Sequence, residues 1–318
     1  MKAVITTIQA PTECTKHLIS CLNGDELIVI GDTKTPDYKI DGATYYSICD
    51  QKSFDFEIIK NLPEKNYTRK NIGYLLAMKD NDLIYETDDD NKPNTFWKIP
   101  KLNNIAEIHI GGTFLNVYKH FTTYNIWPRG LPLEYINLSS NTLSDLTGDY
   151  VIQQGLVDES PDVDAIWRMM YNHIVDFTPN QNITTDSYVP FNAQNTWWFK
   201  KAFPLMYLPS TCTFRMTDIW RSFIAQRCLK PFGERVLFTK ATAIQIRNKH
   251  NIYEDFKMEV DGYVGNIRFV DVIDNIKMTD DIYKNLHICY SGLIRDGFFA
   301  KGEIKILEAW INDCKKIL

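Results

Sequence analysis

The spacing of hydrophobic residues predicts alternating strands and helices in the first third of the chain. Residues 2–9 form a β-rich run, residues 12–23 fit a helix, and residues 26–31 (ELIVIG) form a continuous apolar run that ends in Gly-Asp. Such a run is typical of a strand buried on both faces of a parallel sheet. Two strands joined by a helix make a right-handed βαβ unit. This part of the sequence therefore indicates an α/β fold.

A second helix and strand follow in the same order. The apolar positions between residues 72 and 78 lie on one face of a helix predicted over residues 68–80, which Thr68 would cap. Residues 83–87 (LIYET) form the next strand, and Asp88, Asp89 and Asp90 follow it directly. We therefore expect the acidic triplet (Asp88–Asp90) at the end of a buried strand.

The remaining pattern completes one contiguous domain. Residues 91–160 are rich in Asn, Gly, Pro and Thr with short β-like runs (AEIHI, FLNVY, YVIQQ), which predict strands and functional loops. From residue 161 the pattern turns helical again. We expect a catalytic domain over residues 1–260 and a helical C-terminal extension over 261–318 packed on it. The apolar stripe of that extension comprises Ile304, Leu307, Ile311, Cys314 and Leu318.

Composition excludes several classes of protein. A chain of 318 residues with 44% hydrophobic residues can bury a sizeable core, and its formal net charge of -5 carries no long basic run that would indicate nucleic-acid binding. No window approaches 18 consecutive apolar residues, and the start lacks the shape of a signal peptide. Seven cysteines form no CxxC pair. These features predict a cytoplasmic protein without a transmembrane segment, a zinc site or a disulfide framework.

The acidic triplet is the most informative feature for chemistry. Ligands of open α/β sheets bind at the carboxyl ends of the strands, where this triplet is expected. Three adjacent carboxylates repel one another, and Mg²⁺ or Mn²⁺ with oxygen ligands would compensate them. The alternative is a solvated acidic turn, helped by Asn91 and Pro93. The preceding strand makes the two interpretations about equal.

Polar residues near other element ends are candidates for binding a nucleotide. Thr6, Thr7, Gln9 and Asp32 lie at the ends of the first two strands, where a base and ribose would lie in this architecture, although strand-end Thr and Asp are also routine turn residues. Arg69 and Lys70 begin the helix before the triplet. Basic residues are unfavourable at a helix N-terminus, so these two would either hold phosphate oxygens or be simply solvated.

Two further residues are candidates for catalysis. Arg129 lies in a rigid, turn-rich segment (WPRGLP) and would clamp a phosphate or carboxylate, or else form a structural salt bridge. Asp218 precedes Trp220 near a helix start, where it would cap the helix or act as an acid or base. No GxGxxG, GxxxxGK[ST], GxSxG or HExxH motif occurs.

Several of these segments together resemble the STELLO family, plant Golgi proteins with a glycosyltransferase-like domain. The resemblance covers roughly residues 1–260. A fainter similarity reaches the reversibly glycosylated polypeptides, which are UDP-arabinopyranose mutases and share the acidic triplet, an Arg-Gly-x-Pro segment and an Asp-x-Trp helix. The matching segments are VIGDTKTP (29–36), TRKNIGYL (68–75), WPRGLPL (127–133), and QGL (154–156) leading to PDVD (161–164).

The resemblance implies a GT-A-like fold for nucleotide-diphospho-sugars, with a mixed, mostly parallel sheet flanked by helices. It implies that Asp88, Asp89 and Asp90 bind Mn²⁺ (or Mg²⁺) and a UDP-sugar. Arg129 matches the arginine that becomes glycosylated in the mutases, and Asp218 would be the acceptor base if the reaction inverts. Both families place a metal-binding His where this chain reads IQIR (244–247), which leaves His250 as the substitute. The STELLO proteins carry a transmembrane anchor, and we expect none in this chain, since no window approaches 18 consecutive apolar residues.

These observations predict a metal-dependent glycosyltransferase that moves a sugar from a nucleotide-sugar donor to a glycan or other acceptor. The alternatives are a UDP-sugar mutase or self-glycosylating protein with the sugar on Arg129, and a non-catalytic scaffold. A homo-oligomer is possible. Low Ala with abundant Lys, Asn, Ile and Tyr suggests an AT-rich bacterial or viral genome, in which surface-polysaccharide synthesis would be a natural pathway.

Overall fold

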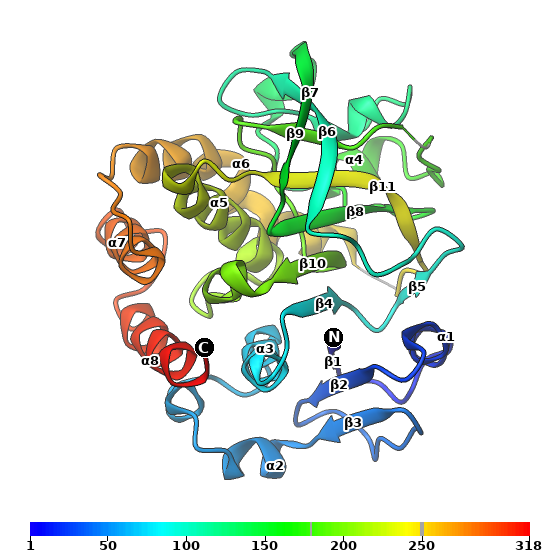
Figure 1. Cartoon of the computed structure of the whole chain (residues 1–318), viewed down its shortest axis with the longest axis vertical. Helices are drawn as coiled ribbons and strands as arrows, with labels where there is room; N and C mark the ends of the chain where they lie inside the picture. The colour runs from blue at the N-terminus through cyan, green and yellow to red at the C-terminus, as the bar shows by residue number, and fades with distance from the viewer. Residues whose placement is uncertain (179, 249–250) are drawn as a thin grey trace.

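The chain is built around one mixed β-sheet, seen in a computed structural model that describes residues 1–178, 180–248 and 251–318 (Figure 1). In these residues the sheet has the strand order β3-β2-β1-β4-β10-β8-β11-β9-β6-β7, and β5 pairs with β11. The strands are β1 (Lys2–Thr7), β2 (Glu26–Gly31), β3 (Ala43–Tyr46), β4 (Leu83–Thr87), β5 (Asn91–Pro93), β6 (Asn103–Ile110), β7 (Asn141–Asp149), β8 (Ile152–Asp158), β9 (Ile183–Thr185), β10 (Asn195–Phe199) and β11 (Val236–Gln245).

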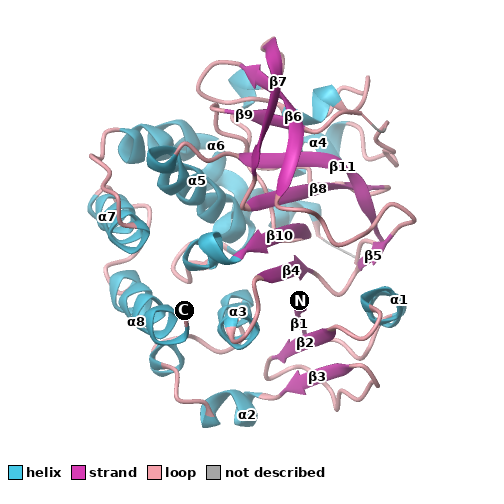
Figure 2. Ribbon diagram, in the orientation of Figure 1, coloured by secondary structure: helices cyan, strands magenta, loops and turns pink. Residues whose placement is uncertain are grey.

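Helices cover both faces of this sheet (Figure 2). Most belong to one large face, whereas α1 lies on the other side beside β1 and β2. The helices are α1 (Glu13–Leu22), α2 (Ile48–Ser53), α3 (Lys70–Met78), α4 (Ala165–Met170), α5 (Thr217–Leu229), α6 (Ile252–Asp274), α7 (Ile282–Arg295) and α8 (Glu303–Ile317), with 3-10 turns that include η1 (Glu57–Lys60), η2 (Tyr67–Arg69), η3 (Val117–His120), η5 (Lys200–Met206) and η6 (Phe214–Met216).

Alternation along β1 explains why both faces are covered. Val4 packs into the large core beneath α3, whereas Ala3 and Ile5 pack on the opposite face with Leu18 of α1. Successive side chains of a strand point to opposite faces, so a strand that is apolar at every position needs a cover on both sides. The same reasoning applies to β2, predicted as a continuous apolar run, and to β4, in which all five residues are buried.

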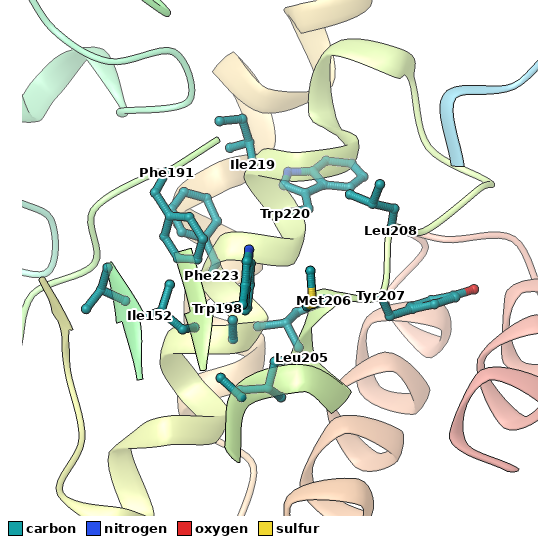
Figure 3. Close-up of a cluster of buried hydrophobic side chains, with 14 of the residues drawn as sticks. Ile152, Phe191, Trp198, Leu205, Met206, Tyr207, Leu208, Ile219, Trp220 and Phe223 are labelled. Carbon is teal, nitrogen blue, oxygen red and sulfur yellow. The ribbon is translucent and has the colours of Figure 1, made fainter. Parts of the chain in front are cut away.

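The large core continues between the sheet and α5 (Figure 3). Trp198 of β10, Phe191 and Phe223 lie among the fully buried side chains there. The C-terminal helices complete this core, and buried carboxylates attach them to the rest of the protein through hydrogen bonds. Asp313 of α8 accepts hydrogen bonds from the backbone amides of Glu57 (2.8 Å) and Ile58 (2.9 Å). The C-terminal helices are therefore integral to the core.

Strand direction brings five strand ends to one edge of the sheet. Strands β1, β2 and β4 are mutually parallel, and β10 is inserted antiparallel between β4 and β8. Because β8 is antiparallel to β10 and parallel to β11, both run in the same direction as β4. The carboxyl ends of β1, β2, β4, β8 and β11 therefore meet at the edge where open α/β sheets bind ligands.

The predicted α/β class is confirmed, with a mixed sheet flanked by helices and a helical C-terminal portion. The predicted division at residue 260 falls within α6 and stays a prediction. Helical structure after residue 161 is only partly right, since β9 and β10 lie there. The FLNVY run (114–118) is not a strand: Phe114 forms an isolated bridge with Tyr188, and Val117 and Tyr118 begin η3. In the described parts of the chain, no helix is long and apolar enough to cross a membrane.

Thr68 does not cap the helix that follows it, so that prediction is wrong. The helix is preceded by the 3-10 turn η2, and the Asn66 side chain accepts the backbone N–H of Thr68 at 3.0 Å. Helix α3 then begins at Lys70 without a side-chain cap. The cap lies two residues earlier because the 3-10 turn, rather than the α-helix, has the first free amides.

Replacing Gly73 by alanine tests the close contact of α3 with the sheet. A Cβ at this position would lie 2.6 Å from Val4 Cγ1 and 2.8 Å from Ile30 Cγ1, so α3 would have to move away from the sheet. We expect Gly73→Ala to lower the free energy of unfolding by about 1–3 kcal/mol, as overpacked cores do. Gly148→Ala is the control, because a Cβ there meets nothing within 4 Å. Equal urea denaturation midpoints for the two variants would contradict this packing.

Candidate active site

A cavity of about 720 Å³ opens at the carboxyl edge of the sheet. Its volume lies in the range of sites that enclose small molecules. The sequence brings residues from both halves of the chain into its wall, as the strand directions require. The predicted site residues that line it are Thr6, Thr7, Gln9, Asp32, Asp88, Asp89, Asp90, Arg129 and Asp218.

The two basic residues predicted to hold phosphate, Arg69 and Lys70, do not line this cavity. The Lys70 side chain is fully buried, and its Nζ donates to the Thr87 carbonyl at 2.6 Å and to Asp88 Oδ1 at 2.8 Å. Arg69 is also buried and donates from Nε to Gln51 Oε1 at 2.6 Å. Lys70 therefore contacts the acidic triplet from the protein interior, and the hydrogen bond from Arg69 to Gln51 links η2 to α2.

The other two carboxylates of the triplet contact different walls. Asp89 accepts a hydrogen bond from the hydroxyl of Thr7 at the end of β1. Asp90 Oδ2 accepts one from Gln245 Nε2 at 3.0 Å, at the end of β11, with Asn248 Nδ2 at 3.5 Å. The triplet therefore joins the ends of β1, β4 and β11.

Burial makes the triplet electrostatically costly. It raises the pKa of all three carboxyl groups, and the Lys70 ammonium only partly offsets this for Asp88 and Asp89. Burial, together with repulsion from Asp88 and Asp89, raises the pKa of Asp90 to about 7. Within residues 1–178, 180–248 and 251–318, no group of three or more His, Cys, Asp or Glu side chains is arranged to hold a metal ion. The triplet is thus a concentration of negative charge with one neighbouring ammonium.

Asp32 organises a loop on the β1–β2 side of the cavity. Its Oδ1 accepts the backbone amides of Thr33 (2.6 Å) and Lys65 (2.8 Å), and its Oδ2 accepts that of Asn66 at 2.9 Å. These contacts hold the segment before η2 against the end of β2. Asp32 therefore shapes this part of the wall.

Thr6, Thr7 and Gln9 form the neighbouring part of the wall. Thr6 Oγ1 donates to the Ile30 carbonyl at 2.9 Å, and the backbone amide of Gln9 donates to Thr7 Oγ1 at 3.0 Å. The Gln9 side chain is exposed. This wall is polar and its backbone is held in place by local hydrogen bonds.

Arg129 holds two carboxylates on the opposite half of the chain. Its Nε and Nη2 donate to the two oxygens of Asp162, both at 2.8 Å, while Nη1 and Nη2 donate to Asp218 at 3.1 and 3.0 Å. Nη1 also donates to the Arg215 carbonyl. All three guanidinium nitrogens are engaged, and bidentate pairs of this kind fix geometry as well as charge.

Asp218 is ionised and fixed in this arrangement. Burial acts to raise its pKa, but the Arg129 guanidinium outweighs burial and lowers the pKa below its usual range. Its Oδ2 also accepts the backbone amide of Ala193 at 3.3 Å. The side chain thus links α5 to the segment that precedes β10.

Several wall residues were not predicted from the sequence. Gln245 and Asn248 contact Asp90 from 155 and 158 residues along the chain. The signal for this segment was the resemblance, which places a metal-binding His at IQIR (244–247). Tyr67 and Phe214 line the cavity with adjoining rings. Tyr67 directly precedes the predicted segment 68–71, whose own residues do not line the cavity. His250, the predicted substitute ligand, lies outside the described residues.

Comparison with known proteins confirms the resemblance to the STELLO glycosyltransferases. A family model described as "STELLO glycosyltransferases" matches residues 215–318. Two proteins of Arabidopsis thaliana, "Probable glycosyltransferase STELLO1" and "Probable glycosyltransferase STELLO2", are each 25% identical to this chain over 338 residues, which cover 98% of this chain and 44% of each relative. The chain therefore spans less than half the length of these relatives.

Solved structures with a related overall shape include two of low sequence identity. Glucosyl-3-phosphoglycerate synthase from Mycobacterium tuberculosis, in complex with phosphoglyceric acid, matches with a TM-score of 0.42 and 10% identity over 84% of this chain and 77% of that one. GalNAc-T7 with UDP, GalNAc and Mn²⁺ matches with a TM-score of 0.41 and 8% identity over 92% of this chain and 54% of that one. The family resemblance therefore rests on the sequence matches.

Replacing Arg129 by alanine would remove the guanidinium that Asp162 and Asp218 both contact and leave the two carboxylates buried. We expect the free energy of unfolding to fall by about 3–5 kcal/mol, because breaking a buried ion pair leaves an uncompensated charge. Arg235→Ala is the matched control, since the partner of Arg235, Asp186, is exposed and such pairs contribute about 0–1 kcal/mol. Denaturant titration of both variants measures the difference, and similar losses would contradict the role assigned to Arg129.

Proposed function

We propose that this chain is a GT-A-type, metal-dependent glycosyltransferase that transfers a sugar from a nucleotide-sugar donor, a UDP-sugar, to a glycan or other acceptor. The observation that carries the proposal is the acidic triplet in a cavity large enough for such a donor, at the ligand-binding edge of the sheet. The resemblance to the STELLO glycosyltransferases supports the same class.

Charge balance supports a cation beside the triplet. Asp162 and Asp218 share Arg129, and Glu86 below the site is paired with Arg221 at 2.7 Å. Among the described residues the triplet is paired only with Lys70, so carboxyl groups remain in excess at this point of the cavity. A divalent cation held by one or two carboxylates completes its shell with substrate phosphates, and so needs fewer protein ligands than a closed metal site. The carboxylate oxygens of the triplet suit Mg²⁺ or Mn²⁺.

Each wall of the cavity then has a role toward the donor. Thr6, Thr7 and Gln9, with the loop held by Asp32, would contact the nucleoside, and Asp88, Asp89 and Asp90 would hold the cation. When bound, the cation offsets charge that develops on the departing diphosphate. Lys70 orients Asp88 and partly offsets the rise in its pKa on burial, and Gln245 orients Asp90.

The geometry around Arg129 favours a transferase over a self-glycosylating protein. Its three guanidinium nitrogens all donate to Asp162, Asp218 or the Arg215 carbonyl, so none is free to carry a sugar without breaking these bonds. Asp218 is ionised, as a proton acceptor must be, but the Arg129 contact that keeps it ionised also makes it a weaker base. In an inverting reaction we assign Asp218 to the acceptor hydroxyl and Arg129 to positioning Asp218.

Thermal unfolding with and without ligands tests the donor site. A ligand that binds only the folded state at 100 times its dissociation constant stabilises by about 2.7 kcal/mol, which raises the melting temperature by several degrees. We expect such a shift with UDP or a UDP-sugar only when Mn²⁺ is present. Asp90→Asn, alone and with Asp88→Asn, should abolish the metal-dependent part of the shift. The single variant keeps the Lys70–Asp88 pair, so it separates loss of binding from loss of folding.

Asp80→Asn with Asp82→Asn is the matched control. These carboxylates lie before β4, outside the cavity, and removing them changes the net charge equally. The control should bind UDP and Mn²⁺ as the unaltered chain does. A folded Asp88→Asn, Asp90→Asn variant with an undiminished metal-dependent shift would refute the metal assignment, and no shift with any nucleotide would refute the proposed function.

A further inference from the structure

Phe214 exposes an aromatic ring inside the cavity. Large apolar side chains are normally buried, yet Phe214 is 49% exposed and lines the cavity wall. The other exposed large apolar residue of the wall is Ile8, on the β1 side. An aromatic ring that faces a concave, otherwise polar site offers a flat apolar surface to a ligand.

The position of the Phe214 ring is fixed by an aromatic contact and by hydrogen bonds of the two neighbouring residues. Phe214 meets Tyr67 edge to face with ring centroids 5.3 Å apart, and the Tyr67 hydroxyl donates to Asp88 Oδ1 at 3.1 Å. On either side, Thr213 Oγ1 donates to the Met258 carbonyl and Arg215 Nε donates to Glu259 Oε1 at 2.8 Å. Because the ring is ordered before a ligand arrives, stacking on it costs little conformational entropy.

Gln194 supplies an independent sign of a ligand. It lines the same cavity and is 8% exposed, and its Oε1 has no hydrogen-bond partner among the described residues. A buried oxygen without a partner is costly, and a ligand hydroxyl would satisfy this one once the Gln194 side chain turned toward the cavity. The next residue back, Ala193, donates its amide to Asp218, so Gln194 lies on the Asp218 side of the cavity.

The two side chains lie on the acceptor side of the triplet. Phe214 lies in η6, just before the start of α5, and the carbonyl of the next residue, Arg215, accepts a hydrogen bond from Arg129 Nη1. The backbone at Phe214 is therefore anchored beside the Arg129–Asp218 pair. This step rests on the proposed function, which assigns the β1–β2 wall to the nucleoside. The space beside Phe214 and Asp218 is then left for the molecule that receives the sugar.

We propose that Phe214 and Gln194 form an acceptor subsite for a pyranose ring. The C–H face of the pyranose would stack on Phe214, and a ring hydroxyl would donate to Gln194 Oε1. A pyranose matches this pair because it carries an apolar face and hydroxyl donors on its rim, whereas an apolar acceptor would leave Gln194 Oε1 unpaired. Thr217 and Arg215 add polar groups to the same part of the wall.

Saturation-transfer NMR on the whole chain tests the subsite, with Mg²⁺ and UDP present. The probes are methyl β-D-glucopyranoside and methyl β-D-galactopyranoside, with open-chain sorbitol as the control ligand. We expect saturation transfer to the axial C–H protons of at least one glycoside and no saturation transfer to sorbitol. Phe214→Leu and Gln194→Leu should each weaken glycoside binding at least about fivefold, on the order of one aromatic contact or one hydrogen bond. Phe214→Tyr should retain it.

Phe96→Leu is the matched control, since Phe96 is 46% exposed but lies outside the cavity wall. It should bind the glycosides as the unaltered chain does.

UDP signals in the same samples separate the acceptor-subsite proposal from the proposed function. Two outcomes refute the subsite while the donor site stands. In the first, UDP binds but neither Phe214→Leu nor Gln194→Leu weakens glycoside binding. In the second, UDP binds but neither glycoside receives saturation. If Phe214→Leu weakens UDP binding instead, the ring stacks on the base and the subsite is also refuted. Absence of UDP binding to the unaltered chain counts against the proposed function alone.

Discussion

The buried ammonium of Lys70 is the interaction on which the candidate site depends. It binds the Thr87 carbonyl and Asp88 Oδ1, and so fixes the first turn of α3 to the end of β4. A lysine can be buried in this way only with nearby oxygens to compensate it, and its ammonium partly offsets the cost of burying the Asp88 carboxylate. One contact therefore sets both the position of the helix and the charge at the bottom of the cavity.

Arg129 plays the corresponding role on the other half of the chain, with a different balance of charge. One guanidinium faces two carboxylates through paired hydrogen bonds, which leaves Asp162 and Asp218 satisfied. At the triplet one ammonium faces three carboxylates. The protein thus neutralises its buried acids at one point and leaves them in excess at another, which localises the attraction for a cation within the cavity.

Local patterns in the sequence predicted the structural features that depend on residues close together in the chain. A β-rich run, a continuous apolar run and the LIYET segment correctly predicted β1, β2 and β4, and the triplet lies at the carboxyl end of β4 as expected. The direction in which Arg69 and Lys70 point depends on how α3 is rotated against the sheet, which spacing alone does not determine. The antiparallel insertion of β10 and the contact of Gln245 with Asp90 arise from pairing between distant segments, for which a single sequence carries no local signal.

The contact between Asp90 and Gln245 also bears on when the site can exist. It joins positions 155 residues apart, and β5, which follows the triplet, finds its partner only in β11. Pairings of such long range carry a large loop-closure cost and form slowly. During synthesis, which proceeds from the N-terminus, the triplet emerges long before the strand that completes its surroundings. A nascent chain therefore carries the acidic residues without the site, and binding competence belongs only to the fully folded protein.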